Sequence, residues 1–592
     1  MKKFLGSILS SCLGTLLALI VLILVFAGIG STFMATSKAS KHVQANSILR
    51  LVIPDELPEQ SNNRPLQNFN LDNSISIGLH DLTRAIKNAT TDGNIKGIYL
   101  QGSGFNHPYA SLKVIRDALL EFKNSGKFIV TYAQFIDHKS YYLQSVAQSI
   151  YAHPYTFIDL KGFQASVPHF KELFDKLGID FNIYYAGEFK SATEPFRFNK
   201  MSAQNRLQLR EFLQSEYQEY LKEIANSRTI DKNELQNLFD LYKCYSPKLA
   251  LSNKLIDSIA YESDVYANMR SKIGLQESDK MNFISIEDYF ETSKSKNEDY
   301  SSSNRIAVVY AEGDITDASG EEGQIGRKYI KIFRDIRTTK SIKAMVLRVN
   351  SPGGSAMLSD EILKEIDLIR AAGKPVVVSM GNYAASGGYY IACHADSIFA
   401  NPYTLTGSIG VFALIPNFTK ISGDKMGIDI DTVGTGSMAC KFNVMLPWGT
   451  DEARILQENI SETYNRFISV ISEGRKLEIE KVQEIAKGRI WSGTKAIEIG
   501  LVDALGELKD AILCASRMAS IDKYRISEFP TQKDPMQKWI DAIQGKKEDQ
   551  SEVLTKSILK SEMSELYPYY TEFKYWKSQK GYHMKLPFVF SN

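Results

Sequence analysis

The stretch NIKGIYL at residues 94–100 returns as SIKAMVL at residues 341–347. SIYAHPYT from Ser149 likewise matches SIFANPYT from Ser397, and three further pairs of segments match in the same order. The five offsets lie between 246 and 249 residues. Ordered matches at a nearly constant offset indicate an internal repeat, so the chain consists of two copies of one domain.

The repeat divides the 592 residues into five parts. We predict a first copy at residues 46–292 and a second copy at residues 304–525. Between them, residues 293–303 are polar and poor in apolar side chains, which is typical of a linker. Residues 1–45 precede the copies as a predicted membrane anchor. Residues 526–592 follow as a C-terminal extension, either irregular or an additional strand.

The overall composition excludes several classes of protein. Hydrophobic residues make up 44% of the chain and charged residues 23%, which are globular proportions. The net charge of +2 gives no electrostatic reason to expect nucleic acid as a partner. The five cysteines are scattered and form no C-x-x-C pair, which argues against a disulfide framework and a cysteine zinc site. We expect no nucleic acid, metal or cofactor.

The N-terminal segment predicts a membrane location. No charged residue lies between Lys3 and Lys38, and residues 16–29 (LLALIVLILVFAGI) are almost continuously apolar. The uncharged stretch is long enough for the roughly 20 residues that a bilayer requires. A cleaved signal peptide is the alternative, but the apolar part is long and no clear A-x-A site follows it. We therefore favour an uncleaved anchor. Lys2 and Lys3 keep the N-terminus in the cytoplasm, which places the remaining chain outside it.

Each copy has the pattern of an α/β domain. In the second copy, RIAVVYAEGDI from Arg305, AMVLRVNS from Ala344 and KPVVVSM from Lys374 are apolar runs of strand length. Between the last two, the apolar residues share one helical face: Leu358, Ile362, Ile366 and Ile369. Alternating strands and helices predict a largely parallel, buried sheet, whose functional sites form at the carboxyl ends of the strands.

Two glycine-rich stretches follow strands in the second copy only. SPGGS at residues 351–355 replaces QGSGF of the first copy, and AASGGYY replaces IDHKSYY. Ser386 in the latter follows a strand, and we expect a helix to begin there, whose free N–H groups can stabilise an anion. The N–H groups of Gly353, Gly354 and Gly387 are candidates for an oxyanion hole. Both glycine pairs are equally compatible with tight turns.

A serine nucleophile needs a base. His394 lies eight residues after Ser386, or roughly 12 Å along a helix, which is too far for a direct hydrogen bond. Lys190, in GEFKSATEPF after an apparent strand, is the alternative, and Lys441 lies near the aligned place in the second copy. GTGSMA, which precedes Lys441, is only weak evidence for a dinucleotide site without a confirmed helix and acidic partner.

These segments resemble the signal peptide peptidase A (protease IV) family in its long, duplicated form. The matching pieces are KSATEPF around Lys190, NSPGGS around Gly353, SMGNYAASGGYYIA around Ser386, NPYTLTGSIGVF and GRIWSGTKAIEIGLVDALG. The resemblance covers about residues 1–525. It implies two tandem Clp-protease/crotonase-like domains behind an N-terminal transmembrane helix.

The resemblance also implies roles for particular residues. Ser386 corresponds to the nucleophile, Lys190 to the general base and Ser408 to a serine that orients the lysine. Gly353 and Gly387 correspond to the oxyanion donors. The implied protein is a membrane-anchored serine endopeptidase that cleaves remnant signal peptides and other apolar peptides through an acyl-enzyme. It is a homotetramer in the bacterial inner membrane, with the catalytic domains on the periplasmic side.

A lysine can act as a base near neutral pH only if its surroundings lower its pKa. A free lysine has a pKa near 10.4, so only about 0.1% is neutral at pH 7.5. Burial among apolar groups can lower the pKa of a lysine far enough for the neutral amine to be populated at this pH. Glu188 and Glu194 would oppose such a shift if they lay beside the amine, so we expect them to point away from Lys190.

Two other functions remain open on the sequence alone. The SPGG turn could hold a coenzyme A thioester, since crotonases share the implied fold. A non-catalytic membrane scaffold is the third possibility, in which Ser386 has no chemical role.

Overall fold

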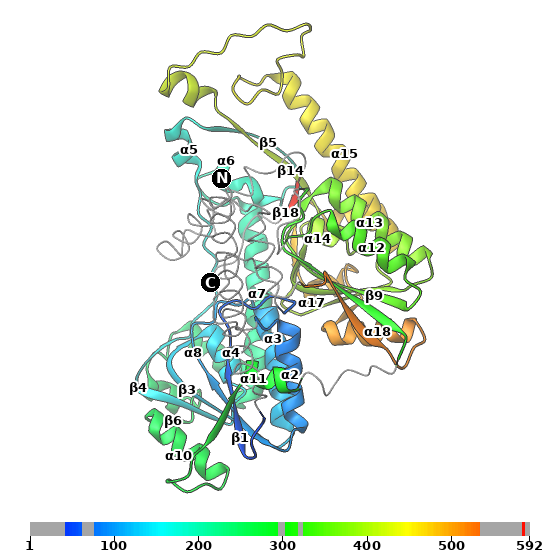
Figure 1. Ribbon diagram of the computed structural model, residues 1–592. Coiled ribbons are helices and arrows are strands. Elements are labelled where there is room, and N and C mark those ends of the chain that lie inside the picture. Colours follow the sequence, from blue (N-terminus) through cyan, green and yellow to red (C-terminus); the bar gives the residue numbers. More distant parts are fainter. Residues whose placement is uncertain (1–41, 62–75, 294–301, 318–323, 533–582, 586–592) are drawn as a thin grey trace, which may run out of the picture.

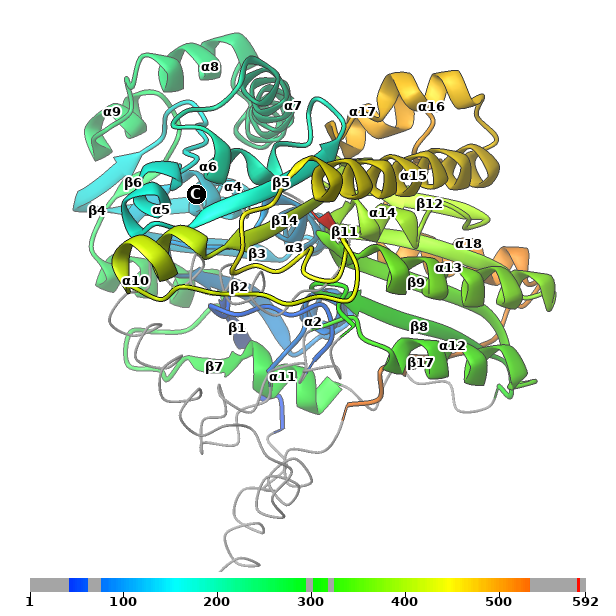
Figure 2. The same ribbon diagram turned by 90° about the horizontal axis from the view of Figure 1, so that it is seen from above.

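The structure is a computed structural model, and the residues it describes are 42–61, 76–293, 302–317, 324–532 and 583–585. Within these ranges, no helix is long and apolar enough to cross a membrane. The predicted anchor at 1–45 lies almost wholly outside them. Figures 1 and 2 show two α/β lobes side by side, one formed by each copy.

The first copy is built on a six-stranded parallel sheet with strand order β6-β4-β3-β2-β1-β7. Its strands are β1 (Ser47–Val52), β2 (Ile95–Gln101), β3 (Phe128–Asp137), β4 (Ser149–Asp159), β6 (Ser258–Ile259) and β7 (Asn282–Ser285). Alternation along β1 covers both faces, because Leu49 packs with the helices on one side while Ile48 packs with α10 (Glu262–Lys272) on the other.

Helices connect these strands and cover the sheet. They are α2 (Leu79–Thr91), α3 (Tyr109–Asn124), α4 (His138–Gln144), α7 (Ala203–Arg228), α8 (Lys232–Asp240), α9 (Pro247–Ser252), α10 and α11 (Ile286–Ser293). Two short helices, α5 (Lys171–Leu177) and α6 (Glu194–Arg197), flank β5 (Asp180–Ala186). In Figure 2, β5 projects from this lobe toward the second copy.

The second copy has an eight-stranded sheet, with β15-β13-β11-β9-β8-β17 in order. In addition, β12 pairs with β11, and β16 pairs with β12. Its strands are β8 (Arg305–Glu312), β9 (Ile342–Ser351), β11 (Val376–Ala385), β12 (Ser397–Ala400), β13 (Leu405–Gly407), β15 (Ile490–Ser492), β16 (Ala504–Leu505) and β17 (Arg525–Phe529). All pairs are parallel except β13 with β15. The edge strand β17 lies across the boundary expected at residue 525.

The helices of the second copy are α12 (Lys328–Thr338), α13 (Ala356–Ala371), α14 (Gly387–Tyr390), α15 (Thr450–Arg475), α16 (Ile479–Ile485), α17 (Gly493–Glu498) and α18 (Leu508–Met518). Along β8, Ile306 and Val308 pack against α18, whereas Ala307 and Val309 join the core under α12 and α13. The predicted apolar face of α13 is buried in that core. Both copies are therefore α/β domains, as the repeat predicts.

A third sheet joins the two copies. Its strand order is β10 (Gly353–Ser355), β18 (His583–Lys585), β14 (Val411–Asn417) and β5, and all neighbours are antiparallel. β5 of the first copy pairs with β14 of the second along its whole length, from Ala186 opposite Val411 to Asp180 opposite Asn417. The lysine segment, which follows β5, is thereby brought to the second copy.

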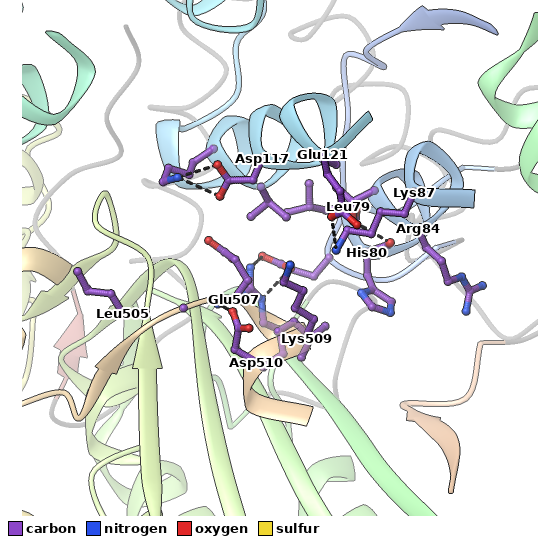
Figure 3. A pocket seen from close by; sticks show the side chains of 18 of the residues that line it. Leu79, His80, Arg84, Lys87, Asp117, Glu121, Leu505, Glu507, Lys509 and Asp510 are labelled. Atoms are coloured by element: carbon purple, nitrogen blue, oxygen red, sulfur yellow. Dashed lines mark hydrogen bonds and ion pairs between the residues drawn. The ribbon is translucent and has the colours of Figure 1, made fainter. Parts of the chain in front are cut away.

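Polar contacts also cross the boundary between the copies. Glu59 and Arg348 form an ion pair at 3.0 Å in which each side chain is 4% exposed. A cavity of about 620 Å³ lies nearby, lined by α2, α3 and the start of α18 (Figure 3). In it, Lys87 pairs with Glu121 at 3.4 Å. Neither Lys190 nor Ser386 lines this cavity.

Glu59→Ala is expected to lower the free energy of unfolding by about 3–5 kcal/mol, because Arg348 would be left as an unpaired buried charge. Urea denaturation measures the change. The matched control is Glu361→Ala, which breaks the exposed pair with Arg327 and should cost at most about 1 kcal/mol. Equal losses of unfolding free energy in the two variants would show that burial does not make the Glu59–Arg348 pair more important for stability than an exposed pair.

Candidate active site

Lys190 is held in a tight turn after β5. The N–H of Phe189 donates to the carbonyl of Lys487 at 2.8 Å, and the N–H of Lys190 donates to Gly187 at 3.0 Å. Glycines of the second copy leave space for the lysine stem. A Cβ at Gly488 would lie 2.6 Å from Lys190 Cβ, and one at Gly410 would lie 3.2 Å from Lys190 Cδ. Larger residues at these two positions would displace the lysine.

Ser386 stands between β11, which ends at Ala385, and α14, which begins at Gly387. Its φ of 56° and ψ of −118° are unusual for a residue other than glycine and store backbone strain. The conformation is held because the Ser386 N–H donates to the carbonyl of Gly407 at 2.8 Å. Behind the turn, a Cβ at Gly388 would come within 2.5 Å of the Ser351 carbonyl, so this position requires glycine.

The two candidate catalytic side chains meet across the boundary between the copies. Lys190 Nζ lies 2.8 Å from Ser386 Oγ, 2.9 Å from the carbonyl oxygen of Ser408 and 3.1 Å from Ser408 Oγ. A neutral amine has two N–H hydrogens and one lone pair. The two oxygens of Ser408 can accept the hydrogens, which leaves the lone pair for the hydroxyl of Ser386.

Burial sets the electrostatics of this pair. Ser386 is 0% exposed and Lys190 is 1% exposed. Desolvation by burial holds the pKa of Lys190 well below its usual value, because the charged form is disfavoured away from water. The ring of Phe412 lies 5.9 Å from Nζ. A largely neutral amine is the form that can accept a proton.

The neighbouring carboxylates do point away from the amine, as expected. Glu188 forms an ion pair with Lys487 at 3.2 Å. Glu194 accepts hydrogen bonds from the Ser202 N–H at 3.1 Å and from Asn205 Nδ2 at 3.0 Å. These contacts fix the start of α7 and keep negative charge away from Lys190 Nζ.

The candidate oxyanion donors lie on two elements that contact each other, β10 and α14. Gly353 and Gly354 form β10, which contacts α14. Their φ values of 104° and 153° suit glycine, and a Cβ at Gly354 would lie 1.9 Å from the Ile315 carbonyl oxygen. The Gly353 N–H donates to Ser351 Oγ at 3.2 Å, a long bond. Gly387 is the first residue of α14, so its N–H has no acceptor within the helix.

The structure does not bring the alternative bases to Ser386. The ring nitrogens of His394 lie 2.9 Å from Asp367 Oδ1 and 3.0 Å from the Val470 carbonyl oxygen. Lys441 pairs with Glu452 at 3.3 Å. No helix begins at GTGSMA, since the next helix, α15, starts only at Thr450, so this segment lacks the context of a dinucleotide site.

Gln208 on α7 is a site residue that the sequence did not reveal. Its Nε2 donates to the Phe189 carbonyl at 3.0 Å and to Ser191 Oγ at 2.9 Å. Its Oε1 accepts from the Ile490 N–H of the second copy at 3.2 Å. The side chain thus ties the lysine segment to β15. A single glutamine in a mixed helix gives no pattern that would have identified it.

A serine beside a buried amine, on an α/β scaffold, defines the class of serine hydrolases. The model of the family described as "Peptidase family S49" matches residues 121–276 and 369–522, once in each copy. The chain belongs to peptidase family S49 and is a serine protease. Together with the two largely parallel sheets, the paired matches confirm two tandem α/β domains of this family.

Individual relatives agree with the family. "Protease 4" of Haemophilus influenzae is 35% identical over 453 residues, which are 75% of this chain and 73% of that protein. "Protease 4" of Salmonella typhi is 34% identical over 476 residues, which are 79% of this chain and 76% of that protein. A solved structure, a point mutant of ClpP1 from Listeria monocytogenes, is 18% identical with a TM-score of 0.24, covering 35% of this chain and 94% of that one. The relatives support a peptidase rather than a thioester enzyme or scaffold.

Lys190→Met is expected to stabilise the fold by a few kcal/mol at pH 7.5. Keeping the buried lysine neutral at pH 7.5 costs about 4 kcal/mol of folding free energy. The reason is that the unfolded chain binds a proton at this pH that the folded chain does not. Wild-type stability therefore rises with pH toward 10.4, and the advantage of Lys190→Met should shrink by about 1.4 kcal/mol per pH unit. Urea denaturation at pH 7.5 and 9.5 measures it.

The control for this measurement is Lys495→Met, which removes a half-exposed lysine. Its effect on the free energy of unfolding should be small and nearly independent of pH. An advantage of Lys190→Met that does not change with pH would contradict a neutral buried amine.

Proposed function

We propose that Ser386 is the nucleophile and Lys190 the general base of a Ser–Lys dyad that hydrolyses peptide bonds. The observation that carries the proposal is the 2.8 Å contact between Lys190 Nζ and Ser386 Oγ, with both groups removed from water. The amine accepts the hydroxyl proton as Oγ attacks the substrate carbonyl. The resulting ammonium donates its proton to the leaving amine, and water then cleaves the acyl-enzyme with the same base.

The remaining site residues position Lys190 and stabilise the oxyanion. Ser408 accepts the two N–H hydrogens of Lys190 and so aims the lone pair at Ser386. The N–H groups of Gly353, Gly354 and Gly387 stabilise the oxyanion, a contribution of several kcal/mol in comparable sites. For Gly353 this requires its long bond to Ser351 Oγ to open.

The substrates are remnant signal peptides and other apolar peptides. One relative that supports this is a "Putative signal peptide peptidase SppA" of Enterococcus faecium, 34% identical over 221 residues and covering 36% of this chain. The apolar segment at residues 16–29 anchors the enzyme in the bacterial inner membrane, with residues 46–292 and 304–525 as its two domains on the periplasmic side. Substrates left in the bilayer then lie close to the catalytic domains.

The chain assembles with copies of itself into a homotetramer. The counterpart of β5 in the second copy, residues 427–433, carries apolar side chains that are exposed: Ile428 at 46%, Ile430 at 37% and Val433 at 100%. The counterpart of β14 in the first copy, residues 164–170, belongs to no strand. Pairing residues 427–433 of one chain with 164–170 of the next repeats the β5–β14 contact and links chains head to tail.

Full-length protein in detergent is expected to cleave an apolar fluorogenic peptide. Ser386→Ala and Lys190→Met should each lower kcat by at least about 10³-fold. Lys441→Met, the matched lysine control, should remain within about twofold of wild type. The value of kcat/KM should rise with pH and level off well below pH 10.5, because the pKa of Lys190 is lowered. Retention of activity by Lys190→Met would rule out the dyad.

Val433→Asp is expected to disrupt the assembly, because a charge would replace an apolar side chain in the proposed strand contact. Light scattering in detergent should report a smaller particle for this variant than for wild type. Leu513→Asp, at an exposed apolar position on α18, is the control and should leave the mass unchanged. An unchanged mass for Val433→Asp would exclude the head-to-tail strand contact.

A further inference from the structure

The charged cavity between the two copies contains two lysines that face each other. Lys87 reaches into it from α2 of the first copy, and Lys509 reaches into it from α18 of the second. Figure 3 shows the two side chains extending toward each other across the cavity, and their amines are close enough to interact. An ammonium group donates hydrogen bonds and accepts none. Two adjacent ammonium groups therefore repel each other unless an acceptor lies between them.

The nearest carboxylates do not fully neutralise this pair of lysines. Lys87 forms a long ion pair of 3.4 Å with Glu121, whose side chain is half exposed, and such pairs contribute little. Among the residues that the structure describes, no carboxylate forms an ion pair with Lys509. Asp510, its neighbour in the sequence, accepts a hydrogen bond from the Glu507 N–H at 2.8 Å instead. Burial lowers the pKa of Lys87, and the amine of Lys509 lowers it further.

The other charged groups of the cavity are engaged with one another. Lys113 pairs with Asp117 at 2.8 Å, and Arg348 pairs with Glu59 at 3.0 Å. Burial raises the pKa of Glu507 to about 7, so this carboxyl is partly protonated at neutral pH and supplies less than a full negative charge. The excess of positive charge therefore remains at the two facing lysines.

The cavity also has the size and lining of a small-molecule site. Its volume of about 620 Å³ lies within the range of roughly 300–1,000 Å³ that is typical of such sites. Apolar side chains contribute to its wall, among them Leu79, Val114, Ala118 and Leu508. An inorganic anion alone would leave this apolar wall uncovered, whereas an organic body attached to the anion would pack against it.

We propose that this cavity binds a small organic anion, a phosphate ester or a carboxylate, whose oxygens accept hydrogen bonds from both Lys87 and Lys509. Since each copy supplies one of the two lysines, the bound anion links the copies across their boundary. Its organic body packs against the apolar wall that α2, α3 and α18 form. The ligand stabilises the docking of the two copies, and its binding does not depend on the proposed Ser–Lys dyad.

Isothermal titration calorimetry of the full-length protein in detergent, with phenyl phosphate as the probe, tests the site. Lys509→Met and Lys87→Met should each weaken binding at least about tenfold, because a charge-assisted hydrogen bond is lost. Lys509→Arg keeps the charge and should retain binding. Lys481→Met, which removes an exposed lysine on α16, is the matched control and should bind as wild type does. Equal affinity in wild type and Lys509→Met would overturn the inference.

Three further probes separate the parts of the ligand. Inorganic phosphate carries the charge without the organic body and should bind more weakly than phenyl phosphate, whereas benzyl alcohol carries the body without the charge and should not bind. Phenylacetate distinguishes the two sources of the anion, because tighter binding of phenylacetate than of phenyl phosphate indicates a carboxylate and the reverse order indicates a phosphate ester. Benzyl alcohol that binds as tightly as phenyl phosphate would contradict the role of the lysines. Inorganic phosphate that does so would contradict the organic body.

Thermal unfolding provides a second readout of the link between the copies. A ligand that binds only the folded chain, present at about 100 times its Kd, shifts the unfolding equilibrium about 100-fold toward the folded state. Phenyl phosphate should therefore raise the unfolding temperature of wild type and Lys481→Met, but not that of Lys509→Met. Sodium chloride at equal ionic strength controls for simple screening of the two charges. An increase that sodium chloride reproduces, or no increase at all, would reject a bound anion.

Hydrogen exchange of the wild-type protein locates the bound anion. With phenyl phosphate present, the amides of α2 and of the first turns of α18 should exchange more slowly, while those of α16 should be unchanged. Protection confined to other elements would place the anion elsewhere and overturn the inference. None of these measurements requires catalysis, so a failure of the proposed dyad would leave them unaffected.

Discussion

The antiparallel pairing of β5 with β14 is the constraint on which the active site depends. Lys190 lies four residues beyond the last pair of this ladder, and Ser408 lies three residues before its first. A slip of two residues would move the lysine by almost 7 Å, and a slip of one would turn β5 over. The contact of 2.8 Å between Nζ and Ser386 Oγ tolerates neither. The two copies must therefore pair in one register, which Gln208 reinforces from the opposite side.

Divergence between the copies follows from this arrangement. Where the second copy has Ser386, the first has His138, whose ring packs edge-on against Phe163 and Tyr220. Burial lowers the pKa of His138 to about 4, and its Nε2 accepts a hydrogen bond from the Lys161 N–H at 2.9 Å. Aromatic packing thus occupies the place where the second copy has its serine. The first copy keeps the scaffold and contributes the lysine, while the second contributes the serine and the glycines.

Much of this could be predicted from the sequence, since it follows local patterns. The repeat predicted two similar α/β domains. The divergent segments indicated Ser386, the family resemblance implied Lys190 as its base, and the structure places the two in contact. Contacts between distant segments could not be predicted. β18 is too short to have a periodic pattern, β17 crosses the expected end of the second copy, and Gln208 acquires its role only when α7 meets β15.

The proposed division of the dyad between the copies also determines when the chain becomes an active protease. The amine lies 196 residues before the hydroxyl in the sequence. At roughly 5–20 residues per second, synthesis of that interval takes about 10–40 s. During this time the first domain can fold, but Ser386 and β14, which positions the lysine segment, have not yet been synthesised. In the proposed mechanism, proteolysis therefore begins only when the second domain has been synthesised and has docked on the first.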